Sequence, residues 1–176
     1  MVRYVTLILA FAMLVGVFWV GLQQDPSKLP SPYIGKAAPD FDLPSLTHPD
    51  QRVNSASLEG QLALVNVWAT WCVGCRQEHE FLMQLATANP LPIYGINWRD
   101  NRADALRWLQ QLGDPYVASG FDEDARVGID WGVYGAPETF LVSPDGIVVY
   151  KHLGPLTAAI WERDFVPHIE NANGAQ

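Results

Sequence analysis

The chain has 176 residues, of which 49% are hydrophobic and 17% charged, a composition typical of a folded domain and incompatible with a largely disordered chain. Its 11 Lys and Arg residues stand against 19 Asp and Glu residues, for a net charge of −8. Without a basic cluster, no nucleic-acid partner is expected. The two cysteines are too few for a disulfide-stapled framework or a four-thiolate metal site.

The N-terminus carries a long uncharged segment. Val5–Leu22 contains 18 residues without a charge, close to the roughly 20 helical residues that cross the hydrocarbon core of a bilayer. The segment is apolar on all sides, which disfavours a core helix of a soluble domain. It is longer than the apolar region of a usual secretory signal and lacks a small-x-small cleavage site before Gln23. We therefore expect residues 1–24 to be an uncleaved membrane anchor, with a removed signal peptide as the alternative.

The flanking charges predict the orientation of this anchor. Arg3 precedes the segment and Asp25 follows it, so the positive-inside rule keeps the N-terminus cytoplasmic and places the rest of the chain outside. Residues 25–34 contain three prolines, a pattern typical of a semi-rigid, extended linker. A single domain is expected over residues 35–176.

Hydrophobic periodicity divides this domain into alternating strands and helices. Leu62–Trp68 is a mostly apolar run, as in a strand buried on both faces. An apolar stripe after the cysteines predicts a helix that ends near Asn89, before Pro90. Further strands are expected at 92–97, 116–119, 139–142 and 147–152, with helical segments between Asn101 and Gly113, at 127–131, and at 157–170 with a kink at Pro167. This order predicts an α/β domain with a central mixed sheet flanked by helices.

The two cysteines stand three positions apart at the start of the helix after the first long strand. The free N–H groups and the positive dipole end of a helix stabilise a thiolate, so the pKa of Cys72 is expected to be lowered. Cys75, one turn inward, can resolve a mixed disulfide formed on Cys72. We therefore predict a thiol:disulfide exchange site in which Cys72 is exposed and Cys75 is shielded.

Other roles for the pair are less consistent with the sequence. Zinc would need a fourth ligand beside Cys72, Cys75 and His79, and the chain has no further cysteine. Residue 76 is Arg, so the Cys-x-x-Cys-His haem attachment motif is missing. A purely structural disulfide remains an alternative, although a bridge that closes so short a loop adds little stability. No metal or other cofactor is expected.

Four motifs indicate a family. The sequence of residues 68–76, WATWCVGCR, resembles the redox site of the thioredoxin fold, and that of residues 132–141, GVYGAPETFL, resembles its cis-proline loop. Together with GINWRD at 95–100, YKHLG at 150–154 and the anchor, the chain is similar to the DsbE/CcmG type of membrane-tethered thiol:disulfide interchange proteins of cytochrome c biogenesis.

This resemblance implies a fold, an activity and a location. The domain would have a thioredoxin-like fold in the bacterial periplasm, tethered to the inner membrane. It would take electrons from a membrane thiol donor of the DsbD/CcdA type and reduce the disulfide of apocytochrome c or of a cytochrome c maturation thiol protein. The competing hypotheses are a general periplasmic thiol oxidant, or another enzyme of the same fold, and a tethered apocytochrome-binding or haem-binding chaperone without redox turnover.

The resemblance also implies how a substrate is held. Pro137 would be the cis-proline beside the cysteines, and the backbone of Ala136 would pair with an incoming peptide strand. Trp71 is expected to shield the thiols and to contact the substrate. Glu138, next to the proline, is a candidate for contact with the partner.

One residue departs from the thioredoxin pattern. Asn66 occupies the strand position where the resemblance leads one to expect a carboxylate that serves the inner thiol. Glu78 is the replacement candidate, because it lies one helical turn from Cys75, where burial would raise its pKa. Glu138 is the second candidate. For either carboxylate the alternative is an ordinary solvated surface group.

Overall fold

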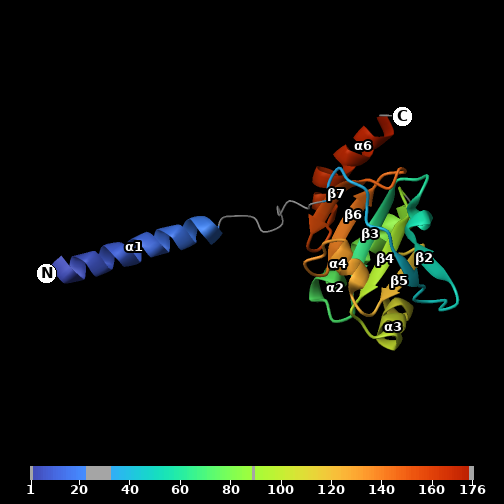
Figure 1. The fold of residues 1–176 in the computed structure, drawn as a ribbon, viewed down its shortest axis with the longest axis horizontal. Helices are drawn as coiled ribbons and strands as arrows, with labels where there is room; N and C mark the ends of the chain where they lie inside the picture. The colour runs from blue at the N-terminus through green and yellow to red at the C-terminus, as the bar shows by residue number, and fades with distance from the viewer. Residues whose placement is uncertain (1, 23–32, 89, 175–176) are drawn as a thin grey trace.

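The computed structural model describes residues 2–22, 33–88 and 90–174, so residues 25–32 of the expected linker 25–34 lie outside the described residues. Helix α1 spans Val2–Leu22 (Figure 1). Its segment Arg3–Leu22 is long and apolar enough to cross a membrane, and none of it is buried by the rest of the described chain. The N-terminal helix is therefore a candidate transmembrane span, as predicted.

A five-stranded sheet forms the centre of the domain (Figure 1). Its strands lie in the order β5-β4-β3-β6-β7. The first three in this order are parallel, whereas β6 and β7 are antiparallel to their neighbours. The bounds are β3 Ala63–Trp68, β4 Ile93–Trp98, β5 Ala118–Asp122, β6 Glu138–Val142 and β7 Val148–Leu153.

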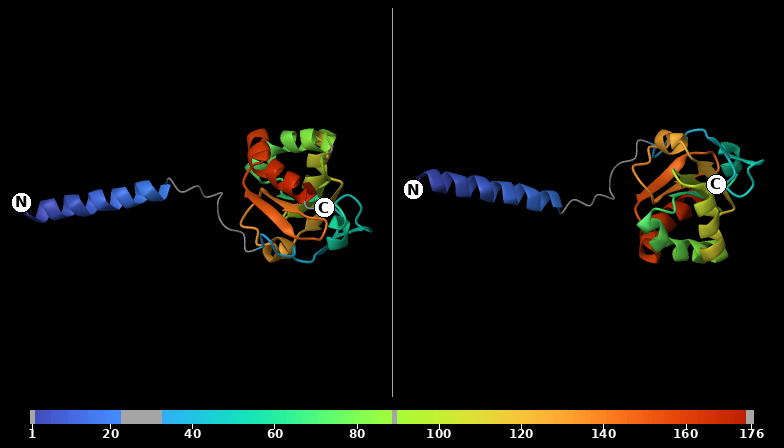
Figure 2. Two further views of the ribbon diagram at one scale, coloured as in Figure 1. Left: turned by 90° about the horizontal axis from the view of Figure 1, so that it is seen from above. Right: turned by 90° about the horizontal axis from the view of Figure 1, so that it is seen from below.

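Helices cover both faces of this sheet (Figure 2). One face packs against α2, α3 and the C-terminal helices, and the other against α4 and the hairpin β1-β2 with its following 3-10 turn. The bounds are α2 Val73–Ala88, α3 Arg102–Leu112, α4 Arg126–Asp130, α5 Ala158–Ile160, the π-helical turn η3 Trp161–Phe165, α6 Val166–Gly174, β1 Asp42–Pro44, β2 Arg52–Asn54 and η2 Ser55–Leu58.

The alternation of side chains along β3 explains these two layers. Ala63, Val65 and Val67 belong to the core on the hairpin side, while Leu64 and Trp68 belong to the core on the α2 side. All six residues of β3 are buried, as expected for a central strand.

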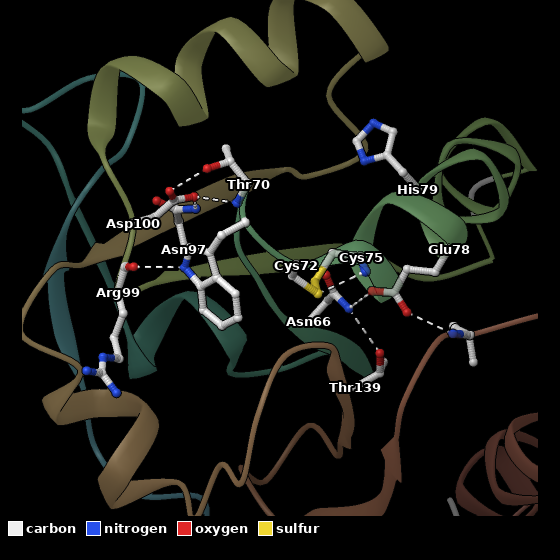
Figure 3. The surroundings of a disulfide bond; sticks show 12 residues. Asn66, Thr70, Cys72, Cys75, Glu78, His79, Asn97, Arg99, Asp100 and Thr139 are labelled. Carbon is white, nitrogen blue, oxygen red and sulfur yellow. Dashed lines mark hydrogen bonds between the residues drawn. A yellow bond between two sulfur atoms is a disulfide. The ribbon is translucent and has the colours of Figure 1, made fainter.

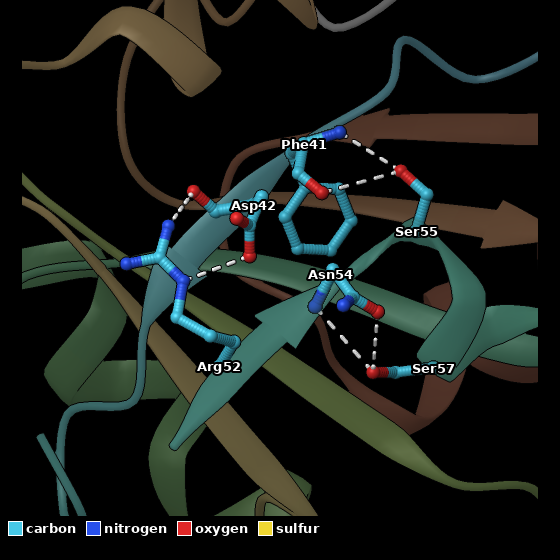
Figure 4. A network of polar contacts seen from close by, with 6 residues as sticks. All are labelled: Phe41, Asp42, Arg52, Asn54, Ser55 and Ser57. Carbon is cyan, nitrogen blue, oxygen red and sulfur yellow. Dashed lines mark hydrogen bonds and ion pairs between the residues drawn. The ribbon is translucent and has the colours of Figure 1, made fainter. Parts of the chain in front are cut away.

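Polar contacts hold the β1-β2 hairpin (Figure 4). Arg52 donates from Nε to Asp42 Oδ1 at 2.9 Å and from Nη2 to the Asp42 carbonyl at 2.7 Å. The Phe41 N–H donates to Ser55 Oγ at 2.8 Å. These contacts place the apolar side chain of Leu43 over the sheet, and Ser45, the residue after β1, bridges to Gly120 of β5.

Most predicted elements are confirmed, with two corrections. The expected strand at 116–119 lies further along the chain, at Ala118–Asp122, because Tyr116 turns its side chain into the core before the strand begins. The β1-β2 hairpin was not predicted, since strands of three residues are too short to show an alternating pattern. Pro167, where a kink was expected, is the second residue of α6, and the π-helical turn η3 ends two residues before it.

Candidate active site

The site is centred on a disulfide between Cys72 and Cys75 at the N-terminus of α2 (Figure 3). Strand β3 ends at Trp68, and a short loop leads to Cys72, whose carbonyl accepts the first helical hydrogen bond from Arg76 N. The Cys75 N–H donates to Cys72 Sγ at 3.0 Å. A donor in this position favours a thiolate on Cys72 once the bond is reduced.

The expectation that Cys72 is exposed is wrong for the disulfide form. Cys72 is 5% exposed and Cys75 is 3% exposed. Cys72 packs in the same core cluster as Trp68 and Ala69, and the bond to Cys75 draws its sulfur inward. The two sulfur atoms are therefore distinguished by their place on the helix and not by exposure.

The loop before β6 packs against the cysteine turn. The Ala136–Pro137 peptide bond is cis, as the resemblance implies. A Cβ atom added to Gly74 would lie 2.8 Å from Pro137 Cδ and 3.1 Å from Pro155 Cγ. The Pro137 carbonyl accepts from Gly154 N at 2.9 Å. Glycine at position 74 thus lets both proline rings approach the redox pair.

Glu138 is neither a solvated surface group nor an accessible contact for a partner, which corrects both readings. Its side chain is 1% exposed and pairs with the equally buried Lys151 at 2.8 Å, from Nζ to Oε2. Its Oε1 accepts from Tyr134 N at 2.7 Å and Gly135 N at 3.2 Å. Lys151 Nζ also donates to the Gly132 carbonyl at 2.8 Å. This ion pair therefore braces the proline loop from within.

Glu78 is buried on the α2 side of the sheet, with an exposed fraction of 1%. Its Oε1 accepts from Asn66 Nδ2 and its Oε2 accepts from Leu156 N, both at 2.8 Å. Burial raises the pKa of Glu78 to about 7, against the opposing effect of these two hydrogen bonds. The solvated alternative is thus wrong for Glu78, and a carboxyl that titrates near neutrality lies one helical turn from Cys75.

Asn66 connects Glu78 to residues that the sequence did not indicate. Its Nδ2 donates to Thr139 Oγ1 at 3.1 Å, in addition to Glu78 (Figure 3). Its Oδ1 accepts from Tyr116 Oη at 2.8 Å. The only sequence signal for this network was Asn66 itself, because it is a polar residue in an otherwise apolar strand.

Trp71 lies at the surface beside the disulfide, with 53% of its area exposed. Its Nε1 donates to the Arg99 carbonyl at 2.9 Å. Arg99 has φ of +50°, a left-handed conformation that is uncommon outside glycine. Asp100 holds the neighbouring backbone, because its carboxylate accepts from both Thr70 N and Thr70 Oγ1 at 2.6 Å.

A surface cleft of about 530 Å³ opens next to Trp71. It is lined by Trp71, Trp98, Arg99, Tyr134, Gly135 and Ala136. Two residues predicted to bind substrate, Trp71 and Ala136, are therefore brought together on one cleft, while Pro137 and Glu138 are buried behind it.

The described histidines, cysteines and acidic residues form no group of three that could hold a metal ion. His79 instead lies against the Gly113 carbonyl, 3.1 Å from its Nε2, and packs edge-on to Trp108. Burial lowers its pKa.

A Cys-x-x-Cys disulfide at a helix N-terminus, a facing cis-proline and a mixed sheet between helical layers define a thiol:disulfide oxidoreductase with a thioredoxin-like fold. The Redoxin family model matches residues 34–165. The chain belongs to the DsbE family of thiol:disulfide interchange proteins within this group.

Curated relatives and a solved structure carry this assignment. The chain is 47% identical over 166 residues to a DsbE protein of Allochromatium vinosum, covering 94% of this chain and 92% of that one. It is 43% identical over 171 residues to Escherichia coli DsbE, again covering 94% and 92%. A crystal structure assigned to a DsbE protein of Chlorobium tepidum has a TM-score of 0.67 at 27% identity and covers 82% of this chain and 99% of that one.

Proposed function

We propose that this protein is a membrane-anchored periplasmic reductant of apocytochrome c, or of a thiol protein that handles it during cytochrome c maturation. The observation that carries the proposal is the buried Cys72–Cys75 pair, which is covered by Pro137 and lies one turn from a carboxyl that titrates near pH 7. Electrons would come from a membrane thiol donor of the DsbD/CcdA type.

The proposed reaction is a two-step exchange that starts from the dithiol. The Cys72 thiolate attacks one sulfur of the substrate disulfide, which forms a mixed disulfide and releases one substrate thiolate. Cys75 then loses its proton and attacks Cys72 Sγ, which restores the Cys72–Cys75 bond and releases the second substrate thiolate. Two electrons pass to the substrate, and the two substrate sulfurs end as thiols after taking up two protons.

Glu78 is proposed to manage the proton of Cys75. A buried thiol releases its proton slowly unless an acceptor of matched pKa is close, and a carboxyl with a pKa of about 7 meets this requirement at neutral pH. The two hydrogen bonds from Asn66 and Leu156 hold its oxygens in place. Glu78 thus takes the role that Asn66 cannot perform, because an amide does not titrate.

The cleft beside Trp71 is proposed to receive the substrate chain. The half-buried Ala136 lies at its edge, beside Pro137. A peptide paired with the Ala136 backbone would bring its cysteine over Cys72, while the exposed Trp71 ring provides an apolar contact. Glu138 supports this cleft by holding the loop and does not itself contact the substrate.

Membrane anchoring is part of the same proposal. The uncharged segment Val5–Leu22 of α1, with Arg3 before it, supports a single span with the domain outside the cytoplasm. After fractionation, the native chain should stay with membranes through a high-salt wash. Recovery of a shortened chain that begins near residue 23 in the soluble fraction would contradict the anchor.

A cellular assay separates the reductant from its alternatives. Cells that produce only a Cys72→Ala, Cys75→Ala variant should fail to form holocytochrome c, and added thiol reductant should restore formation. Full activity of this variant would favour a binding chaperone without redox turnover. Restoration by an added oxidant in place of a reductant would favour a thiol oxidant.

A further inference from the structure

Asn66 is a buried amide that forms three hydrogen bonds with side chains on the α2 side of the sheet. An amide has two N–H donors on one side and a carbonyl acceptor on the other. Here the donors reach Glu78 Oε1 at 2.8 Å and Thr139 Oγ1 at 3.1 Å, while the carbonyl accepts from Tyr116 Oη at 2.8 Å. Figure 3 shows Asn66 between Glu78 and Thr139, beside the disulfide.

We propose that Tyr116 is a positioning residue for proton transfer at the redox pair, because its hydroxyl fixes the one orientation of Asn66 that presents an N–H group to Glu78. This inference rests on the proposed role of Glu78. It adds a residue 50 positions away from Asn66 in sequence.

A reversed Asn66 amide would meet unfavourable partners on both of its sides. If Asn66 turned over, its carbonyl oxygen would face Glu78 Oε1 and its N–H groups would face the Tyr116 hydroxyl. In that orientation the Asn66 oxygen would repel a charged Glu78 carboxylate but could accept a hydrogen bond from a protonated Glu78. It would also leave the buried Tyr116 O–H without its acceptor, which is costly. Tyr116 therefore opposes the orientation that would stabilise neutral Glu78.

Tyr116 is itself held in place as a donor. Its ring stacks on Trp68, with centroids 5.5 Å apart and planes at 18°. Trp68 is fixed in turn by a hydrogen bond from Nε1 to Ser119 Oγ at 3.2 Å. Burial raises the pKa of Tyr116 well above its ordinary value, with the charges of Glu78 and Asp114 adding to the effect. The hydroxyl thus keeps its proton at any pH at which the exchange occurs.

Titratable and charged groups on the elements packed around Glu78 are His79 on α2, Asp114 and Tyr116 after α3, Glu138 on β6, Lys151 and His152 on β7, and Asp164 in η3. Cys72 and Cys75 are joined in the disulfide and do not titrate in this form. Glu138 is neutralised by Lys151, and His152 interacts with Asp164. Replacement of Tyr116 by Phe leaves all the other groups unchanged. A difference between the parent and this variant therefore reports on the hydroxyl alone.

The test is an infrared titration of the Glu78 carboxyl in the full-length, disulfide-form protein in detergent, with Glu78→Gln to identify its band. Tyr116→Phe should raise the midpoint pH of that band by about half a unit or more, because the charged carboxylate loses a fixed donor. Tyr94→Phe is the matched control. It also removes a tyrosine hydroxyl, but this hydroxyl contacts Gln61, and Tyr94 belongs to the core on the hairpin side of the sheet. It should leave the midpoint unchanged.

Two results would overturn the proposal. One is an unchanged midpoint in a Tyr116→Phe protein whose unfolding temperature matches the parent. The other is an equal shift in Tyr94→Phe. The titration needs no substrate, so it can fail while reductase turnover is intact, and it can succeed in a protein that reduces a different substrate. Its outcome is thereby distinct from that of the proposed function.

Discussion

Gly74 and Pro137 lie in direct contact across the redox site, so closely that a Cβ on Gly74 would stand 2.8 Å from Pro137 Cδ. The size of the side chain at position 74 is therefore restricted by the opposite loop, through Pro137. The contact joins the turn that carries the sulfur atoms to the loop that is proposed to receive the substrate.

Gly74→Ala should lower stability and slow exchange. The added methyl meets two proline rings that cannot rotate away, so we expect a loss of about 1–3 kcal/mol in the free energy of unfolding of the disulfide form. Urea unfolding measures this loss. Gly135→Ala is the control, because a Cβ at that position meets nothing within 4 Å. Equal stability of the two variants would show that the loop carrying Pro137 moves aside without a loss in the free energy of unfolding.

Glu78 should make stability depend on pH. Its pKa is raised from an ordinary 4.5 to about 7, so between these values the folded chain holds a proton that the unfolded chain has released. The stability of the parent relative to Glu78→Gln should thus be highest below pH 4.5 and fall by roughly 3 kcal/mol as the pH rises to about 7. Urea unfolding of both proteins from pH 4 to 8 measures the difference. A difference in unfolding free energy that does not change with pH would mean that folding does not raise the pKa of Glu78.

Glu78→Gln should also change the reaction of Cys75 more than that of Cys72. In the reduced protein, alkylation at mildly acidic pH should label Cys72 first, in the parent and the variant alike, because the helix N-terminus stabilises its thiolate. The pH profile for resolution of a mixed disulfide by Cys75 should lose or shift one step, as expected of a coupled pair. Stopped-flow exchange from pH 5 to 9 measures this profile. Identical profiles would leave Glu78 with a structural role only.

The buried ion pair below the proline loop should be sensitive to loss of one partner. Lys151→Met leaves the Glu138 carboxylate buried without its cation, so we expect a loss of about 3–5 kcal/mol in the free energy of unfolding. Combining it with Glu138→Gln should recover most of this loss, because the amide oxygen can still accept from Tyr134 and Gly135. A single variant within about 1 kcal/mol of the parent would contradict this account.

The sequence predicted the features that depend on local pattern. The helix that starts at the cysteines and the strand Ala63–Trp68 follow from periodicity. The helix after Asn101 follows from capping chemistry, since the Asn101 side chain accepts from Ala103 N and Asp104 N. For Glu78, its place on an apolar stripe indicated burial, but the sequence left a solvated surface position open as the alternative. The cis bond before Pro137 came from resemblance to a known motif and not from the chemistry of the residue.

What could not be predicted depends on contacts between distant residues. Glu138 and Lys151 belong to types that are usually exposed, and only the packing of β6 on β7 buries them as a pair. Tyr116 reaches Asn66 from the loop that precedes β5. The left-handed backbone conformation of Arg99, whose carbonyl accepts from Trp71 Nε1, has no signal in the sequence, because neither arginine nor its neighbours favour a positive φ.

Cys72 is proposed to attack the substrate and Cys75 to resolve the intermediate. Trapping of the mixed disulfide tests these two roles most directly. Full-length Cys75→Ala, isolated from the membranes of cells that make c-type cytochromes, should carry apocytochrome c or a maturation thiol protein as a reducible adduct on Cys72. Cys72→Ala should carry none. Equal adducts on both variants, or a partner bound to Cys72→Ala alone, would contradict the assignment.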